Sequence, residues 1–224
     1  MSEERWQTHS YEGSQAVAVD ITNFYRPRLA GWLGKAFNTL SGKAVKGIAF
    51  GLIAAIGSVE QQRLALPGKL LGSRNEAGCE RALKKQLLTW LAGPLGAKDI
   101  AIFEAGFKLA ELQGAGLKHY VLRQASNCTA SRNDLPSYKG GGARPKYGAL
   151  LRPLPGSPQG NCLRASLPAE SSSFELEGRI IQVQCWHKLI GPDQKPSERH
   201  ARFSLRVFHD PLYHQPLVLA VSLP

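Results

Sequence analysis

The first third of the chain alternates between apolar and polar positions in a way that predicts strands. QAVAVDITNF (15–24) alternates and is rich in β-branched residues, which predicts a strand that ends near Asp20. IAFGLIAAIGSV (48–59) is apolar on both faces, as in a central strand. GSVEQQRLALPGKLL (57–71) predicts a turn and a returning strand, so these two segments would form a hairpin. The stretch 25–47 is rich in Gly, Lys and Arg and predicts a loop.

The middle of the chain changes to a helical period. In 75–93, Leu83, Leu87, Leu88 and Leu91 recur at helical spacing, which predicts an amphipathic helix. After it the pattern predicts, in chain order, a fourth strand, a short helix and a fifth strand, at 98–106, 108–116 and 117–125. Strands that return through helices indicate a mixed α/β sheet.

The last part of the chain has a different character. Residues 126–162 carry many Pro and Gly together with Lys and Arg, which predicts a long, loop-rich segment. The alternation in 173–190 and 199–211 predicts antiparallel strands joined by a turn at 191–198. A last apolar strand, 215–224, runs into the C-terminus, which favours a chain that stops before its domain does.

Composition adds a preference for polyanions. The 224 residues are 43% hydrophobic and 20% charged, as in an ordinary globular protein, but the net charge is +11 and the pI is near 9.7. Such a surface attracts nucleic acid, although a merely soluble basic protein has the same totals. The four cysteines lie far apart, without zinc-site spacing, and the polar N-terminus is no secretory signal. A reducing cytoplasm fits these features.

Two acids follow or end apolar runs. Asp20 ends the first predicted strand and Glu104 ends the fourth. If these strands lie side by side, both carboxylates emerge at one edge of the sheet, close enough to share divalent cations. Two such ions can activate a nucleophile and stabilise the leaving oxygen at a phosphodiester. The alternative is that the Asp is a turn former or a helix cap.

Several longer stretches carry a family resemblance. VAVDITNFYRPRL, GSVEQQRLALP, FEAGFKLAELQGAGLKHYVLRQASNCTASR and YGALLRPLP resemble bacterial insertion-sequence transposases of the DDE type. The resemblance covers roughly residues 15 to 224. It implies an α/β fold: an RNase H-like mixed sheet with helices (1–126), a β-rich insertion (127–214) and a return strand to the core (215–224). The most specific parts are the Asp-bearing first strand and the acid-x-Gly-Phe turn.

The resemblance also implies a function. Members of this family use Mg²⁺ (or Mn²⁺) to cut and join DNA at the ends of the element. Asp20 matches the first catalytic and metal-binding acid, and Glu104 matches the second, where the family normally has Asp. The third acid is a Glu on a helix beyond the insertion, and the chain ends at Pro224 before such a helix. The resemblance therefore implies an incomplete copy that is inactive on its own.

The partners implied are DNA, with a homodimer or a separate C-terminal segment as further ones, and a nucleoid-associated place in the cytoplasm. The alternative function is a non-catalytic basic protein that binds DNA, or a nucleic-acid-binding module with no transposase history. Two groups of basic residues are candidates for phosphate contacts, with a solvated basic face as their alternative. They are Arg26, Arg28, Lys35, Lys43 and Lys46 after the first strand, and Arg132, Lys139, Arg144, Lys146 and Arg152 in the insertion.

Other reactive side chains lack the pattern of a site. The sequence contains no HExxH pair, no GxGxxG fingerprint and no Walker pattern. Ser126 and Cys128 have no partnered base that the sequence identifies. The histidines are therefore interpreted as ordinary strand and loop residues: His119, His187, His200, His209 and His214.

Overall fold

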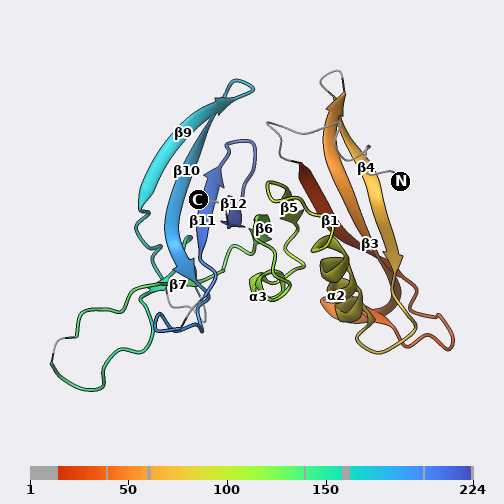
Figure 1. Cartoon of the computed structure of the whole chain (residues 1–224), viewed down its shortest axis with the longest axis horizontal. Coiled ribbons are helices and arrows are strands. Elements are labelled where there is room, and N and C mark those ends of the chain that lie inside the picture. Colours follow the sequence, from red (N-terminus) through yellow and green to blue (C-terminus); the bar gives the residue numbers. More distant parts are fainter. Residues whose placement is uncertain are drawn as a thin grey trace. The chain divides into compact units, whose positions relative to one another are not determined.

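A computed structural model describes residues 15–38, 40–59, 62–138, 140–157, 162–198 and 200–222. The chain divides into two compact units, residues 1–119 and residues 120–224. Figure 1 shows the strands and helices of each unit. The predicted insertion bounds, 127–214, differ from this division and stay a prediction.

The first unit is built on a mixed sheet in which the hairpin and the fourth strand are placed as the hydrophobic pattern predicts. Its strands are β1 (Ala16–Tyr25), β2 (Lys35–Asn38), β3 (Lys43–Val59), β4 (Gln62–Gly72) and β5 (Ile100–Phe103). β3 pairs antiparallel with β1, β2 and β4, which explains why its sequence is apolar on both faces. β1 also pairs with β5, in the parallel direction.

One face of this sheet is covered by helix α2 (Cys79–Leu91). The leucines that set the helical period are buried, with Leu83 and Leu87 at 1% and 0% exposure. Leu87 packs directly over Gly51 of β3, where a side chain of any size would meet it. The second helix, α3 (Leu109–Gly114), is short and begins with a capping box between Lys108 and Glu111.

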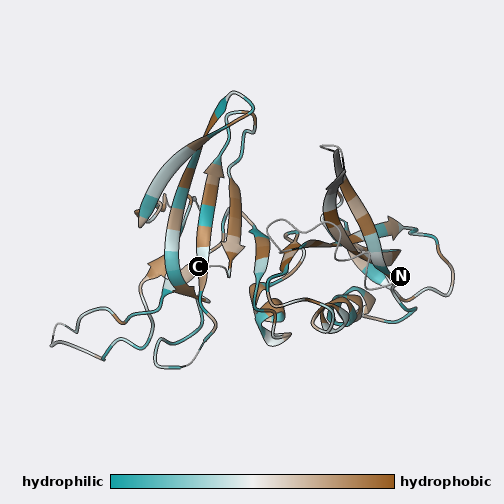
Figure 2. Ribbon diagram, turned by 45° about the horizontal axis from the view of Figure 1, so that its top comes forward, coloured by the Kyte–Doolittle hydropathy of each residue, from teal (hydrophilic) through white to brown (hydrophobic). Residues whose placement is uncertain are grey.

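The second unit is a sheet of short and long strands. Its order is β6 (Tyr120–Gln124), β12 (Leu217–Val221), β11 (Phe203–His209), β10 (Arg179–Ile190), β7 (Ala130–Arg132) and β8 (Leu150–Leu151), and β9 (Glu170–Leu176) pairs with β10. Hydrophobic and hydrophilic residues alternate along much of β11, FSLRVFH, whereas β12, LVLAV, is apolar throughout (Figure 2). Trp186, Leu205 and Val207 are among its buried side chains.

Three predicted boundaries are wrong. β1 continues to Tyr25, so Asp20 lies inside the strand and does not end it. The expected loop 25–47 contains β2 and the start of β3, because residues 35–38 pair with residues 43–46 as a hairpin. The expected strand 173–190 is two strands, β9 and β10, that turn at Glu177 and Gly178, whose φ values are 50° and 75°. A tight hairpin turn requires such positive φ angles.

At the level of fold class, the structure confirms a mixed sheet with few helices. Parallel and antiparallel pairings occur together in the first unit, as the order of strands and helices predicts. In the part of the chain that the structure describes, no helix combines the length and the apolar character needed to cross a bilayer.

Candidate functional site

The two predicted acids lie on adjacent strands. The parallel pairing of β1 with β5 runs from Ala16 opposite Ile100 to Val19 opposite Phe103. Asp20 follows Val19 within β1, and Glu104 is the first residue after the end of β5; both acids are exposed. Neighbouring strands are about 4.8 Å apart, so the backbones directly before the two acids lie side by side. The prediction that the first and fourth strands lie side by side is confirmed.

Asp20 belongs to the sheet face that α2 does not cover. Val19 and Phe103 are buried at 2% exposure, and each is followed directly by its acid. Because successive side chains along a strand point to opposite faces, Asp20 shares a face with Ala18, whereas Glu104 lies just beyond the end of β5. We call this uncovered side of β1, β3 and β5 the open face.

Two carboxylates are a donor set that divalent cations accept. Mg²⁺ prefers one or two carboxylates and completes its shell with water and phosphate oxygens. Within the described ranges, no group of three or more His, Cys, Asp or Glu side chains is arranged to hold a metal ion.

A row of cations crosses the same face. Lys35 of β2 lies directly opposite Lys46 of β3, and the backbone N–H of Arg26 donates to the carbonyl of Lys46 at 2.8 Å. Like charges placed opposite one another destabilise an antiparallel pair. No described acid forms an ion pair with any of the three, although the Lys46 ammonium donates to the Leu29 carbonyl at 3.3 Å. This arrangement attracts an anion.

Exposed aromatic side chains lie between the cations and the acids. Phe24 is 51% exposed and Phe50 is 37% exposed. Phe50 lies between Thr22 of β1 and Gly72 of β4, two small neighbours that leave its ring open. The guanidinium of Arg26 stacks over the Phe24 ring, 3.7 Å from its centroid. The sequence analysis did not identify Phe24 and Phe50 as surface residues. The alternation of apolar and polar residues does not show which face of a strand stays uncovered.

The other predicted phosphate-binding residues are divided between the units. Arg28 and Lys43 are exposed in the first unit, close in sequence to the cation row. In the second unit the Arg144 guanidinium lies 5.6 Å from the centre of the Tyr138 ring. Lys139 lies outside the described residues. The remaining members of that group, all placed in the second unit, are Arg132, Lys146 and Arg152.

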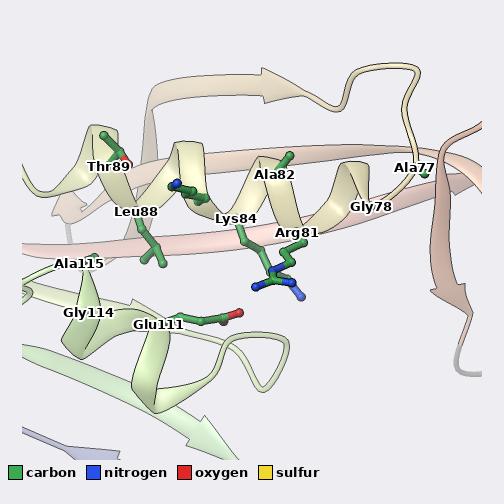
Figure 3. A pocket seen from close by; sticks show the side chains of 11 residues that line it. Ala77, Gly78, Arg81, Ala82, Lys84, Leu88, Thr89, Glu111, Gly114 and Ala115 are labelled. Atoms are coloured by element: carbon green, nitrogen blue, oxygen red, sulfur yellow. The ribbon is translucent and has the colours of Figure 1, made fainter.

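A separate cavity of about 690 Å³ lies between α2 and α3. Figure 3 shows Arg81 and Lys84 reaching from α2 toward Glu111 of α3. The Lys84 ammonium is paired with Glu80 at 2.8 Å, and Glu111 accepts from the Lys108 backbone N–H. These acids offset much of the positive charge of the lining. The cavity contains neither Asp20 nor Glu104.

The histidines of the second unit make local polar contacts. His187 approaches Ser204 through Nδ1 at 3.3 Å and Glu170 through Nε2 at 3.4 Å, and His200 lies 3.4 Å from Glu198. None belongs to a metal-binding group among the described residues.

Cys128 is predicted to be a poorly reactive thiol. Burial raises its pKa from 9.0 to about 11, although the nearby Arg152 charge acts in the opposite direction. Because the thiolate is the reactive form, Cys128 should react much more slowly with iodoacetamide at pH 8 than the exposed Cys162. Mass spectrometry of alkylated peptides measures both rates in one sample. Equal rates would contradict the burial of Cys128.

Comparison of the chain with protein-family models and with curated protein sequences found no match.

Proposed function

We propose that this chain is a DNA-binding protein of the DDE transposase type, in which Asp20 and Glu104 hold a divalent cation against a DNA phosphate. The observation that supports the proposal is the parallel pairing of β1 with β5, which sets Val19 opposite Phe103, the residues directly before Asp20 and Glu104. The order of the main strands supports an RNase H-like core. β4, β3, β1 and β5 are neighbours in that order, β2 pairs with β3 as an addition, and β5 is parallel to β1.

We further propose that this polypeptide does not cleave DNA by itself. The resemblance requires three acids, and it assigns only two of them, Asp20 and Glu104, to residues of this sequence. Glu104 is also one methylene longer than the Asp that the family usually has, and metal sites tolerate small misplacements poorly. The bound cation would neutralise charge between the carboxylates and the phosphate. Asp20 and Glu104 would position it, and the cation row would bind the DNA backbone.

Removal of one carboxylate charge should raise the affinity for DNA in EDTA and should reduce the gain in affinity that Mg²⁺ produces. In EDTA, Asp20→Asn should bind DNA more tightly than the wild type, because a charge that repels phosphate is gone. In Mg²⁺, the wild type should gain affinity and Asp20→Asn should gain much less, because the amide is a poorer cation ligand. Fluorescence anisotropy of a labelled oligonucleotide measures all four affinities. Glu104→Gln should behave as Asp20→Asn does.

Matched controls separate local binding from overall charge. Glu76→Gln and Asp134→Asn remove the same charge from exposed positions away from the carboxylate pair, and should leave the Mg²⁺ dependence unchanged. Electron paramagnetic resonance of Mn²⁺ gives a second readout, since bound and free Mn²⁺ differ in signal. Equal Mn²⁺ binding by the wild type and Asp20→Asn would exclude the cation site. Robust DNA cleavage that Asp20→Asn abolishes would overturn the proposed inactivity.

A further inference from the structure

We infer that the open face binds single-stranded DNA by stacking bases on Phe24 and Phe50, an inference that rests on the proposed function for the identity of the polymer. Phe24 and Phe50 are 51% and 37% exposed on one sheet face, and aromatic side chains gathered on one face beside cations suit a ligand with flat apolar groups and negative charge. Single-stranded nucleic acid combines flat apolar bases with regularly spaced negative charge. Proteins bind it by pairing aromatic side chains with a positively charged path.

The register places the parts of this surface in a line along β1. Arg26 belongs to the cation row, which consists of Arg26, Lys35 and Lys46. Phe24 lies two residues before Arg26, and Thr22 lies opposite Phe50. Asp20 comes two residues further and shares their face. At about 3.3 Å per residue, Arg26 and Asp20 are roughly 20 Å apart, enough for several nucleotides. The strand would run from cations, over two rings, to the carboxylate pair.

The spacing of the rings suits consecutive bases. Phe24 lies opposite Ile48, and Phe50 lies two residues further along β3, so the two rings are diagonal neighbours. Diagonal neighbours on adjacent strands are about 7–8 Å apart, within reach of adjacent unstacked bases. Arg26 adds a planar guanidinium over the Phe24 ring, and such planes also stack on bases. A duplex hides its base faces and cannot use either ring.

The surface favours this occupant over a protein helix because of its charge. An apolar helix would bury Arg26, Lys35 and Lys46 beside the rings, without a described acid to pair with them. A polyanion lying on the same face pairs with these cations and relieves the repulsion between the facing lysines. The cations and the two rings of this face are therefore complementary to a single strand.

The test compares a labelled 15-mer of thymidine with a duplex of the same length, in EDTA, by fluorescence anisotropy. Phe24→Leu and Phe50→Leu keep an apolar side chain but remove the ring. Each should weaken binding of the single strand roughly 5- to 150-fold, the range expected for one lost base stack. Phe24→Tyr and Phe50→Tyr should keep wild-type affinity. Affinity for the duplex should change less than twofold in every variant.

The control is Phe174→Leu, which removes a ring of similar exposure, 45%, from β9 of the second unit and should leave affinity unchanged. Thermal unfolding of each variant shows whether it is folded. Unchanged single-strand affinity in both Leu variants would overturn the inference, as would equal losses on single strand and duplex. Tighter binding of a uridine 15-mer RNA would overturn the assignment to DNA.

Because EDTA removes the cation, failure of the carboxylate site leaves this measurement unaffected. If the wild type binds neither DNA in EDTA but binds in Mg²⁺, the stacking surface is wrong and the cation-dependent function stands. If binding depends on the rings but Mg²⁺ has no effect, the stacking surface stands and the cation site is wrong.

Discussion

Replacement of Trp186 by Ala should lower the free energy of unfolding of the second unit by about 3–5 kcal/mol, the range for a large aromatic side chain removed from a core. Trp186 is 1% exposed, lies opposite Leu205, and donates its indole N–H to the Leu167 carbonyl at 2.9 Å. Ala leaves a cavity and an unpaired carbonyl together. Urea denaturation followed by circular dichroism measures the loss.

Two controls make this result specific. Trp186→Phe keeps most of the packing and loses only the hydrogen bond, so it should cost about 1 kcal/mol. Trp90→Ala, at a half-buried position of α2, should destabilise the first unit instead. Hydrogen exchange of the β10 and β11 amides assigns each loss to its unit. If Trp186→Ala stays within about 1 kcal/mol of the wild type, the second core is not centred on this residue.

The second large effect concerns the contact between α2 and the sheet. Leu87→Ala should cost about 2–5 kcal/mol, because Leu87 is fully buried. Gly51→Ala should cost about 1–3 kcal/mol, because its new methyl group overlaps the Leu87 side chain. The double variant should cost less than the sum, since the methyl group added on β3 enters the space that the Leu87 side chain leaves.

Gly72→Ala provides the matched comparison, because its added methyl group would meet only the Phe50 ring, at 3.8 Å. It should change stability by less than about 0.5 kcal/mol, as most surface substitutions do. Strictly additive losses in the Gly51 and Leu87 cycle would mean that the two residues do not share one packing site. Chemical denaturation of the four proteins of the cycle gives the coupling energy directly.

The elements that could be predicted well from the sequence are those whose period is set by burial. The leucine spacing of α2 and the continuous apolar run of β3 follow from which faces must be covered, so both were found. The β2–β3 hairpin was missed because its lysines resemble a solvated loop, and the β9–β10 turn was missed because Glu177 and Gly178 are an uncommon turn pair. In both cases the structure is set by which backbone segments pair, and the amino-acid composition of a segment does not show its pairing partner.

The candidate site was predictable only in part. Asp20 and Glu104 could be placed together because strand order and direction constrain neighbouring strand positions. Phe24 and Phe50 could not be recognised, because alternation assigns them to a face without showing that α2 covers the other one. The cation row could not be predicted either, because it depends on Lys35 lying directly opposite Lys46, and only the strand register reveals that pairing.

The facing lysines also make the protein respond to ionic strength in two opposite ways. Added salt screens the repulsion between Lys35 and Lys46, so the β2–β3 hairpin should become more resistant to heat as salt rises. The same ions compete with a polyanion for these side chains, so affinity should fall as salt rises. Under the proposed function, the hairpin would be least stable at the low ionic strength at which it binds DNA most tightly, and the bound DNA would itself screen the repulsion between the two lysines.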